Sequence, residues 1–369
     1  MVQGQLTWWQ LSDLHWPAHP STELKRYIDN LLQHLRKSMA VSGRPNFTVF
    51  TGDIAFSGQS KEYDSVGEHL IAPLRELLGN DVPLLFVPGN HDMDRAEALI
   101  KQSRLVTDLT DPAAVDAFVG NPRNRANFAD PFRSYSDFVA QWGPTGTDDA
   151  YRWTHTITAA GHKVTVLGLN SAWAGFYHTT DAPTESDRGR LLLSIDQTPK
   201  PGEDADFTLF AQHHPFEWLN EDICDPAVQS LRRNYQVGLF GHVHSPRELG
   251  QLSSPHSTVL RIPSMLLFGR PHGDDSARYP RGYSVGAIDV TTSECRVRYF
   301  KYDSVYSDSF KEFTDVYSDD GKSPTAVLKP RRHGGGDCAL DRDGTALSVR
   351  RHVASDRPTA QTGAGAHRL

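Results

Sequence analysis

Cysteine is scarce in this 369-residue chain, and the three present, Cys224, Cys295 and Cys338, lie far apart. An odd number at such distances indicates neither a disulfide framework nor a cysteine zinc cluster, so we expect a reducing compartment. The sequence has no apolar run long enough to cross a bilayer. Its first residues show no basic segment followed by an apolar core and a cleavage site. These absences predict a cytoplasmic protein that makes no membrane contact.

An excess of positive charge is also missing, because the formal net charge is −7 and the pI is about 6.2. Non-specific binding of nucleic acid by the whole surface is therefore not favoured, although a local basic groove is compatible with this total. The chain has no Gly-x-x-x-x-Gly-Lys-Ser/Thr phosphate loop, so no ATPase of that class is expected. The length suits one large domain, which we place at residues 1–320, with a tail at 321–369.

Five short strand-like runs each end at side chains that can bind a metal ion. The runs cover residues 6–11, 47–50, 83–87, 207–211 and 236–240. Core packing alone does not explain why each run stops at carboxylates, amides or imidazoles. We interpret the pattern as a metal site built at the ends of strands. The residues that follow the runs are Asp13 and His15; Asp53; Asn90, His91 and Asp92; His213 and His214; and His242 and His244.

Helical spacing of apolar residues at 24–35 and 61–78 separates the first three runs. The resulting order of strand, helix, strand, helix and strand predicts parallel pairing with right-handed crossovers. In sheets of this kind, function gathers beyond the carboxyl ends of the strands, where the first three motifs lie.

The segment 93–150 differs from its surroundings, with helical pieces at 95–105 and 128–142 between proline-containing breaks. We expect an insertion or lid near the site. A hairpin at 151–169 then enters a second sheet. The parallel units followed by later strands predict an α/β fold in which two sheets pack face to face with helices outside. The tail from residue 321 has proline, glycine and scattered arginines with little periodicity, which predicts disorder. The later strands are expected at 258–262, 283–290 and 296–302.

The candidate metal ligands offer only oxygen and imidazole nitrogen, which suits divalent manganese, iron or zinc. Seven ligands are too many for one ion. They suit two ions about 3.5–4 Å apart with a carboxylate between them, an arrangement used for displacement at phosphorus. The seven residues are Asp13, His15, Asp53, Asn90, His213, His242 and His244.

Taken in order, the motifs Asp-x-His, Gly-Asp, Gly-Asn-His, His and Gly-His-x-His resemble those of the calcineurin-like metallophosphoesterase superfamily, over residues 6–302. The resemblance implies a four-layer α/β/β/α sandwich with two mixed sheets. It favours His213, two residues before Pro215, over His214 as a ligand. It implies one metal held by Asp13, His15, Asp53 and His244, and a second held by Asp53, Asn90, His213 and His242.

The resemblance further implies that His91 lies unliganded beside the phosphate and that Asp92 orients it. The Asp-Leu-His and His-His-Pro segments resemble the bacterial cyclic-nucleotide phosphodiesterase branch, and residues 52–58 resemble phosphoesterase domains joined to large bacterial ATPases. Two departures stand out. The segment between Asp92 and Leu169 is longer than in the compact cyclic-nucleotide enzymes, and Phe216 stands where a second proline is common.

These observations predict a two-metal phosphoesterase that hydrolyses phosphodiester bonds by attack of a metal-bound hydroxide, on cyclic or other nucleotides. His91 would assist the leaving oxygen. The motifs contain no arginine to grip a monoester dianion, which favours diesters. The alternatives are a nuclease or phosphomonoesterase of the same fold, or a non-catalytic metal-binding interaction module, for which eroded ligands would be expected. The oligomeric state is left open.

Overall fold

The computed structural model describes residues 4–94, 108–147, 149–175, 187–254, 257–268, 280–304, 307–316 and 323–328. All of them belong to one compact unit, Met1–Arg332. The expected helical piece at 95–105 and the greater part of the expected tail lie outside the described residues.

The first sheet contains the three early strands at its parallel half. β1 (Gln5–Leu11), β2 (Phe47–Thr51) and β3 (Leu84–Val87) run parallel, as the alternation of strands and helices predicts. On the other side of β1 the pairing becomes antiparallel, so the sheet is mixed. The antiparallel strands are β10 (Gly282–Asp289), β11 (Glu294–Asp303), β12 (Ser309–Glu312) and β13 (Thr325–Val327).

The second sheet begins with the expected hairpin, β4 (Arg152–Ala159) and β5 (His162–Leu169), which is confirmed as antiparallel. Beyond it, β5 pairs in parallel with β6 (Phe207–Gln212) and β6 with β7 (Val237–Phe240). The sheet ends with β9 (Ser257–Pro263), parallel to β7, and β8 (Gly250–Ser254), antiparallel to β9. Both sheets are therefore mixed, as expected.

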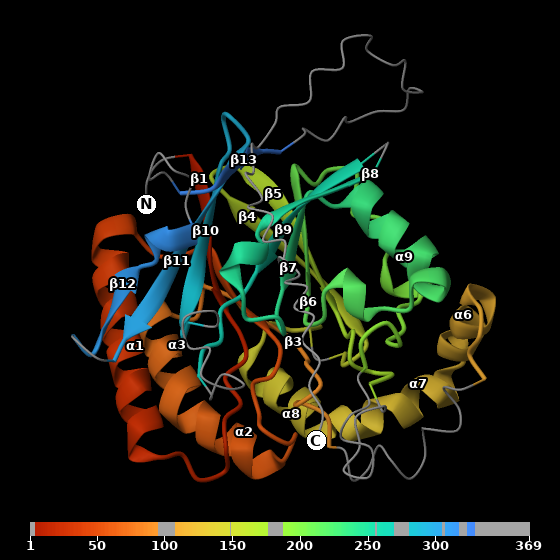
Figure 1. Cartoon of the computed structure of the whole chain (residues 1–369), viewed down its shortest axis with the longest axis horizontal. Coiled ribbons are helices and arrows are strands. Elements are labelled where there is room, and N and C mark those ends of the chain that lie inside the picture. The colour runs from red at the N-terminus through yellow and green to blue at the C-terminus, as the bar shows by residue number, and fades with distance from the viewer. Residues whose placement is uncertain are drawn as a thin grey trace, which may run out of the picture. The chain divides into compact units, whose positions relative to one another are not determined.

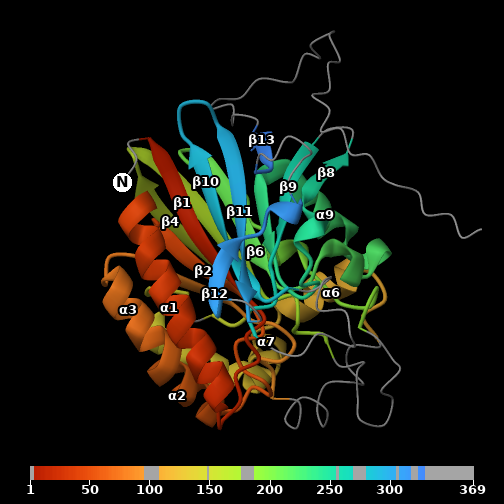
Figure 2. The ribbon, with the colours of Figure 1, turned by 60° about the vertical axis from the view of Figure 1, so that its left-hand side comes forward.

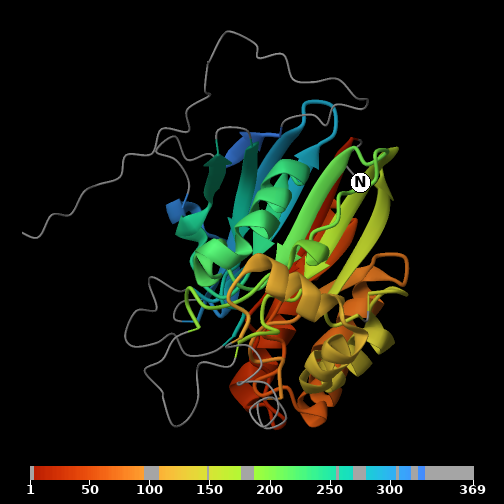
Figure 3. The ribbon, with the colours of Figure 1, turned by 90° about the vertical axis from the view of Figure 1, so that its right-hand side faces the viewer.

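Helices cover the outer faces of the two sheets. Figure 2 shows α1 (Thr22–Ser42), α2 (Ser60–Val66) and α3 (Ala72–Leu78) together along one side of the first sheet. Figure 3 shows α9 (Glu221–Asn234) against the second sheet, on the side away from the first. The predicted four-layer α/β/β/α sandwich is confirmed, and its layers are seen together in Figure 1. Among the described helices, none combines the length and apolar character needed to span a bilayer.

The core follows the two-residue period of strands. Trp8 and Val49 of the first sheet share one buried cluster with Val166 and Leu209 of the second, so their side chains fill the space between the sheets. The intervening residues, such as Phe50, face the helices and join the outer cluster. This alternation fixes the register of each strand.

Two predicted helices are broken at prolines. The predicted helix 61–78 is interrupted by a π-helical turn, Gly67–Ile71, directly before Pro73 in the first turn of α3. Proline has no N–H to donate and its ring clashes with the carbonyl four residues earlier, and the wider turn accommodates both facts. Likewise, 128–142 divides at a 3₁₀ turn, Asp130–Phe132, which contains Pro131. The surrounding helices are α7 (Pro122–Ala129) and α8 (Arg133–Trp142), and α6 (Pro112–Gly120) precedes them.

The described part of the expected insertion, 108–147, is helical. α8 packs on the first sheet and α2, because the ring of Phe138 lies 5.2 Å from that of Phe86 and 5.1 Å from that of Tyr63. α6 contacts the segment between β5 and β6, because its Asp116 accepts a hydrogen bond of 2.6 Å from the hydroxyl of Ser194. Closure over the site by this segment stays a prediction.

Several elements were not expected from the sequence. β13 lies inside the range 321–369, with Ala326 and Leu328 buried, so residues 323–328 pack on the sheet instead of forming a disordered tail. The rest of that range lies outside the described residues, and the division at residue 320 stays a prediction. The other unexpected elements are α6, α9, β8, β12 and the 3₁₀ turns Ile195–Gln197, Phe216–Trp218, Pro246–Glu248 and Thr314–Val316.

Candidate metal centre

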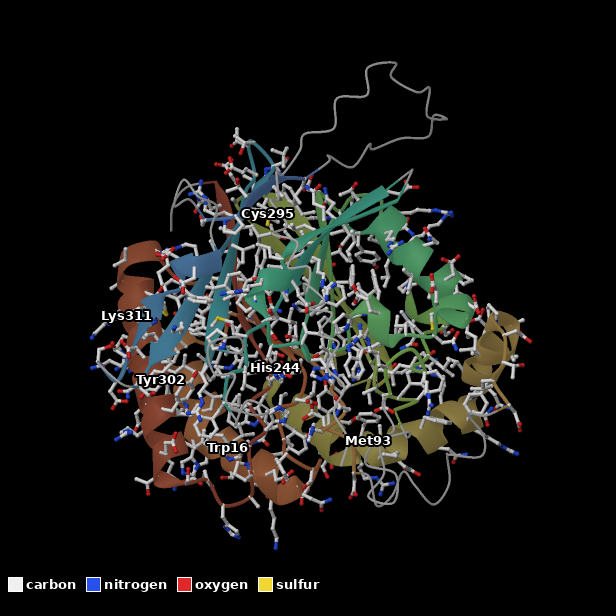
Figure 4. All side chains as sticks on the ribbon, in the orientation of Figure 1. Trp16, Met93, His244, Cys295, Tyr302 and Lys311 are labelled. Carbon is white, nitrogen blue, oxygen red and sulfur yellow. The ribbon has the colours of Figure 1, made fainter. Side chains whose placement is uncertain are left out.

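Five strand ends meet at one edge of the sandwich. β1, β2 and β3 end there from the first sheet, and β6 and β7 from the second. Contacts across the sheets show the meeting directly, since Nε2 of His244 lies 2.8 Å from Oδ1 of Asp13, and Nε2 of His213 lies 3.3 Å from Oδ2 of Asp53. Figure 4 shows His244 near this edge and Cys295 near the opposite one. The seven candidate ligands are thus brought to one place.

The backbone at this edge is strained. Five of the eight non-glycine residues with positive φ in the described chain are candidate ligands. A left-handed conformation costs roughly 1–2 kcal/mol for a residue with a Cβ, and such outliers persist where surrounding contacts over-determine them. Here the amides of Asp13 and His15 donate to the carbonyls of Gly52 and Asp53, each at 2.9 Å. The five residues are Asp13 (φ 58°), His15 (47°), Asp53 (54°), His242 (67°) and His244 (53°).

Three glycines allow the close approach of these segments. A Cβ on Gly52 would overlap the ring of His213, one on Gly89 would overlap the carboxylate of Asp53, and one on Gly241 would overlap the carbonyl of Thr51. Each glycine precedes a candidate ligand by one residue. The Gly-Asp, Gly-Asn and Gly-His pairs of the sequence therefore place the backbone of one strand end against the side chain of another.

Asp13 is fully buried and is surrounded by donors. Its Oδ1 faces His244, while its Oδ2 accepts hydrogen bonds from the Ser264 hydroxyl at 3.1 Å and the His242 amide at 3.2 Å. Burial alone would raise the pKa of this carboxyl, but the attraction of His244 and His213 outweighs it and lowers the pKa to about 2. Asp13 is therefore an ionised carboxylate in a buried position.

Asp53 lies between the two halves of the site and is only 2% exposed. Its Oδ1 accepts a hydrogen bond of 2.8 Å from the amide of His91, and its Oδ2 lies 3.9 Å from Nδ1 of His15 in addition to its contact with His213. Burial would raise the pKa of Asp53, but the surrounding histidines, His213 first, lower it well below the ordinary value. One oxygen is thus anchored to the β3 turn, and the other faces ring nitrogens.

His213 has a fixed ring orientation. Its Nδ1 lies 2.8 Å from the carbonyl of Thr51, which can only accept, so Nδ1 carries a proton and Nε2 faces Asp53. Burial would lower the pKa of His213, but Asp53 outweighs burial and raises it to about 9. His213 thus contacts the central carboxylate, and its preference over His214 as a ligand stays a prediction.

His214 and His242 complete the second half of the cluster. Nδ1 of His242 lies 3.2 Å from Nε2 of His213. His214 lies between the Ser171 hydroxyl, 3.0 Å from its Nδ1, and Oδ1 of Asn90, 3.2 Å from its Nε2. Burial lowers the pKa of both His214 and His242 well below the ordinary value, so both rings are neutral. Neutral imidazole is the form that coordinates a metal.

The donor set fits metal ions. Ligand atoms of Asp13, Asp53 and His213 come within 4.8 Å of one another, and the same holds for Asp13, His15 and His244. Two buried carboxylates this close repel each other, and cations relieve that repulsion. Among the described residues, the buried Nδ1 of His15 has no hydrogen-bond partner, so it is available to bind a metal. These clusters can hold divalent metals, while the assignment of each ligand stays a prediction.

The expected contact between Asp92 and the His91 ring is wrong. Nδ1 of His91 lies 2.7 Å from the carbonyl of Phe56, which orients the ring in place of a carboxylate. The ring of His91 stands edge-on to that of His15, with 4.6 Å between their centroids. A ring nitrogen of His91 also lies within 4.8 Å of ligand atoms of His15 and Asp53, and His91 is partly exposed.

Asp92 instead organises the backbone around the site. Its fully buried carboxylate accepts hydrogen bonds of 2.9–3.0 Å from backbone amides on two strand ends and from one hydroxyl. Burial, followed by repulsion from Asp53, raises the pKa of Asp92 to about 6. A carboxylate can accept hydrogen bonds from several amides of a tight turn at once. The position of Asp92 next to His91 in the sequence does not predict this role. The donors are the amides of Gly89, Ile54 and Ala55 and the hydroxyl of Tyr63.

Sequence reasoning missed other residues around the cluster. Ser264 follows β9, a sixth strand that ends at this edge, so its place after a predicted strand was a usable signal. Ser171, in contact with His214, follows β5 in the same way. Trp218 has its ring 4.0 Å from that of His242, edge-on, and no motif marks it in advance.

Comparison with known proteins gives one match over most of the chain and several weak structural likenesses. A family model described as calcineurin-like phosphoesterase matches residues 6–246. The comparison with curated proteins found no significant match.

Among solved structures, Vps29 of Chaetomium thermophilum is 10% identical, with a TM-score of 0.35, over 90% of this chain and 100% of that one. A 5′-nucleotidase from Candida albicans SC5314 is 12% identical, with a TM-score of 0.36, over 81% of this chain and 51% of that one. A cold-active protein-tyrosine phosphatase of a psychrophilic Shewanella is 14% identical, with a TM-score of 0.28, over 83% and 80%.

Proposed function

Since the chain belongs to the calcineurin-like phosphoesterase family, we propose that this metal-dependent phosphoester hydrolase is a phosphodiesterase that acts on cyclic or other nucleotides. The observation that carries the proposal is the convergence of five strand ends on Asp53, with the partly exposed His91 beside it. We place the protein in the cytoplasm, with a phosphate ester as its partner.

The two halves of the cluster would hold two divalent ions, manganese, iron or zinc. Asp13, His15, Asp53 and His244 would bind one, and Asp53, Asn90, His213 and His242 the other. Such ions supply Lewis acidity and lower the pKa of bound water, which makes displacement at phosphorus accessible at neutral pH. The left-handed backbone of five of these residues keeps their donor atoms in place without substrate.

His91 is proposed to move a proton at the leaving oxygen. The Phe56 carbonyl accepts from Nδ1, so Nδ1 is protonated and Nε2 is the nitrogen left to exchange a proton with substrate. Asp92 supports this step indirectly, because its carboxylate fixes the turn that carries Asn90 and His91. The amide of His91 is in turn anchored to Asp53.

The preference for diesters rests on the charge of the residues at the centre. The described side chains that form it are carboxylates, imidazoles and an amide, and none of them is an arginine. A monoester dianion carries more charge than a diester and gains more from a bidentate guanidinium. A nuclease, a phosphomonoesterase and a non-catalytic metal-binding module are the competing functions.

The test compares two aryl esters at one pH with manganese, after metal removal and reloading. Bis(p-nitrophenyl) phosphate should be hydrolysed with higher kcat/KM than p-nitrophenyl phosphate. The reverse order identifies a phosphomonoesterase. No turnover of either ester by protein with two bound ions supports the non-catalytic module.

A further inference from the structure

Phe56 is an exposed aromatic ring beside the candidate centre. Phe56 is 56% exposed, and it is the only aromatic residue among the exposed large hydrophobic residues of the described chain. Single exposed apolar residues are common on protein surfaces, so the exposure of Phe56 matters because of its place beside the centre. The remaining exposed large hydrophobic residues are Val41, Ile195 and Val327.

The loop that carries Phe56 is held firmly. The amide of Phe56 donates to the carbonyl of Trp16 at 3.0 Å. The next residue, Ser57, donates through its amide and its hydroxyl to the two carboxylate oxygens of Glu62, at 2.9 and 2.8 Å. Glu62 is itself buried, with 4% exposure. The ring is therefore presented by a fixed backbone, which lowers the entropy lost when a ligand packs against it.

The ring lies on the side of the centre where the proton transfer is proposed. Its centroid is 5.8 Å from that of His91, and the same residue's carbonyl orients the His91 ring. A group attached to a phosphate at the centre and directed past His91 would lie beside this exposed ring. A flat group gains more there than a flexible alkyl chain, because aromatic faces pack best on other planar rings.

We propose that Phe56 is a stacking platform for the base of a nucleotide substrate, which makes it a specificity-determining residue. This assignment rests on the proposed function, because it takes the phosphate to lie at the metal cluster. It names the residue that would bind the base of that substrate, since every base can stack on an aromatic side chain. The phosphate would be held by the centre and the base by Phe56.

The experiment measures binding by calorimetry to the full chain loaded with manganese, and so needs no turnover. Adenosine 5′-monophosphate and ribose 5-phosphate share the phosphate and sugar and differ in the base. Wild type should bind the nucleotide about 5- to 100-fold more tightly, the range expected for one stacked base. Phe56→Ala should lose that preference and keep its affinity for ribose 5-phosphate, while Phe56→Trp should retain the preference.

Val41→Ala is the matched control, because Val41 is 86% exposed in the last turn of α1, which leads to the start of β2 and so to the far end of the sheet. It should bind both ligands as wild type does. An equal loss for both ligands in Phe56→Ala, or a base preference unchanged by it, would overturn the assignment. Base-dependent binding without ester hydrolysis would overturn the proposed function alone.

Discussion

Between the two sheets, Trp8, Val49 and Leu209 pack with alternate residues facing inward. Just after the same three strands, Asp13 and Asp53 are buried as charged carboxylates with left-handed backbone, and the buried His213 lies beside Asp53. In this interior, apolar side chains are buried on a backbone with ordinary strand conformation. At the strand ends, which we call the rim, charged side chains are buried and the backbone is left-handed, although both regions belong to the same stretches of chain.

The difference indicates that the interior stabilises the fold, whereas the rim carries the candidate metal centre. Buried charge and positive φ each cost free energy, and the interior must supply the stability that offsets them. Features of this kind gather where a site must be held ready before its ligand arrives. The comparison therefore predicts that substitutions at the rim change metal binding and chemistry, whereas substitutions in the interior change folding.

Asp53→Asn should have the largest effect, because this carboxylate faces both halves of the cluster. An amide cannot supply the negative charge that two cations share. We expect kcat/KM to fall by about 10³-fold or more, which corresponds to the several kcal/mol a metal supplies. Metal analysis should show that both ions bind more weakly.

The control is Asp289→Asn, at the opposite end of β1, where Asp289 pairs with Gln5. It should leave metal content and turnover unchanged. An Asp53→Asn protein with full metal content would break the proposed division between rim and interior.

His91→Ala should reduce turnover by roughly 10²–10⁴-fold, the usual contribution of a general acid or base. The metals of this variant should stay bound, because Asn90 is the predicted ligand from this turn. Nδ1 of His91 contacts the Phe56 carbonyl instead. His155→Ala on the hairpin strand β4 is the matched control and should be active. Loss of metal together with activity would move His91 into the ligand set.

Leu209→Ala tests the interior side of the comparison. Leu209 is fully buried between the sheets, so the substitution should lower the free energy of unfolding by about 2–5 kcal/mol. Metal content and turnover per folded molecule should remain close to wild type. Denaturant unfolding and an activity assay on the same sample measure the two effects, and a selective loss of activity with normal stability would contradict the division.

The sequence predicts most of the framework because periodicity reports it directly. The strands that carry the motifs show strong apolar runs, and the carboxyl ends of parallel strands must share an edge, which brings Asp13, Asp53 and Asn90 together without knowledge of the coordinates. The two-sheet sandwich is also predictable from the order of elements. The prolines at 73 and 131 were visible breaks, although spacing alone suggested continuous helices.

Contacts that depend on three dimensions were not predictable. The carbonyl of Phe56 orients His91 because two loops cross, and a backbone oxygen leaves no trace in a motif. Asp92 was assigned to its neighbour in sequence, whereas its partners come from the β2 and β3 ends and from α2. Antiparallel additions such as β12 and β13 are short and were hidden in segments of low periodicity.

The smallest expected effect on stability comes from truncation at the end of the chain. Two truncations test whether residues 321–332 pack on the domain while residues 333–369 do not contribute to its stability. Removal of 333–369 should leave the melting temperature unchanged, because that segment has too little apolar surface to offset the entropy of ordering it. Removal of 321–369 also deletes β13, with its buried Ala326 beside β11, and the buried Leu328 that follows β13. Losing this apolar burial should lower the melting temperature by about a few degrees while metal-dependent turnover persists at lower temperature. Equal melting temperatures for the two truncated proteins would show that β13 adds nothing to the interior, and the boundary at residue 320 would then stand.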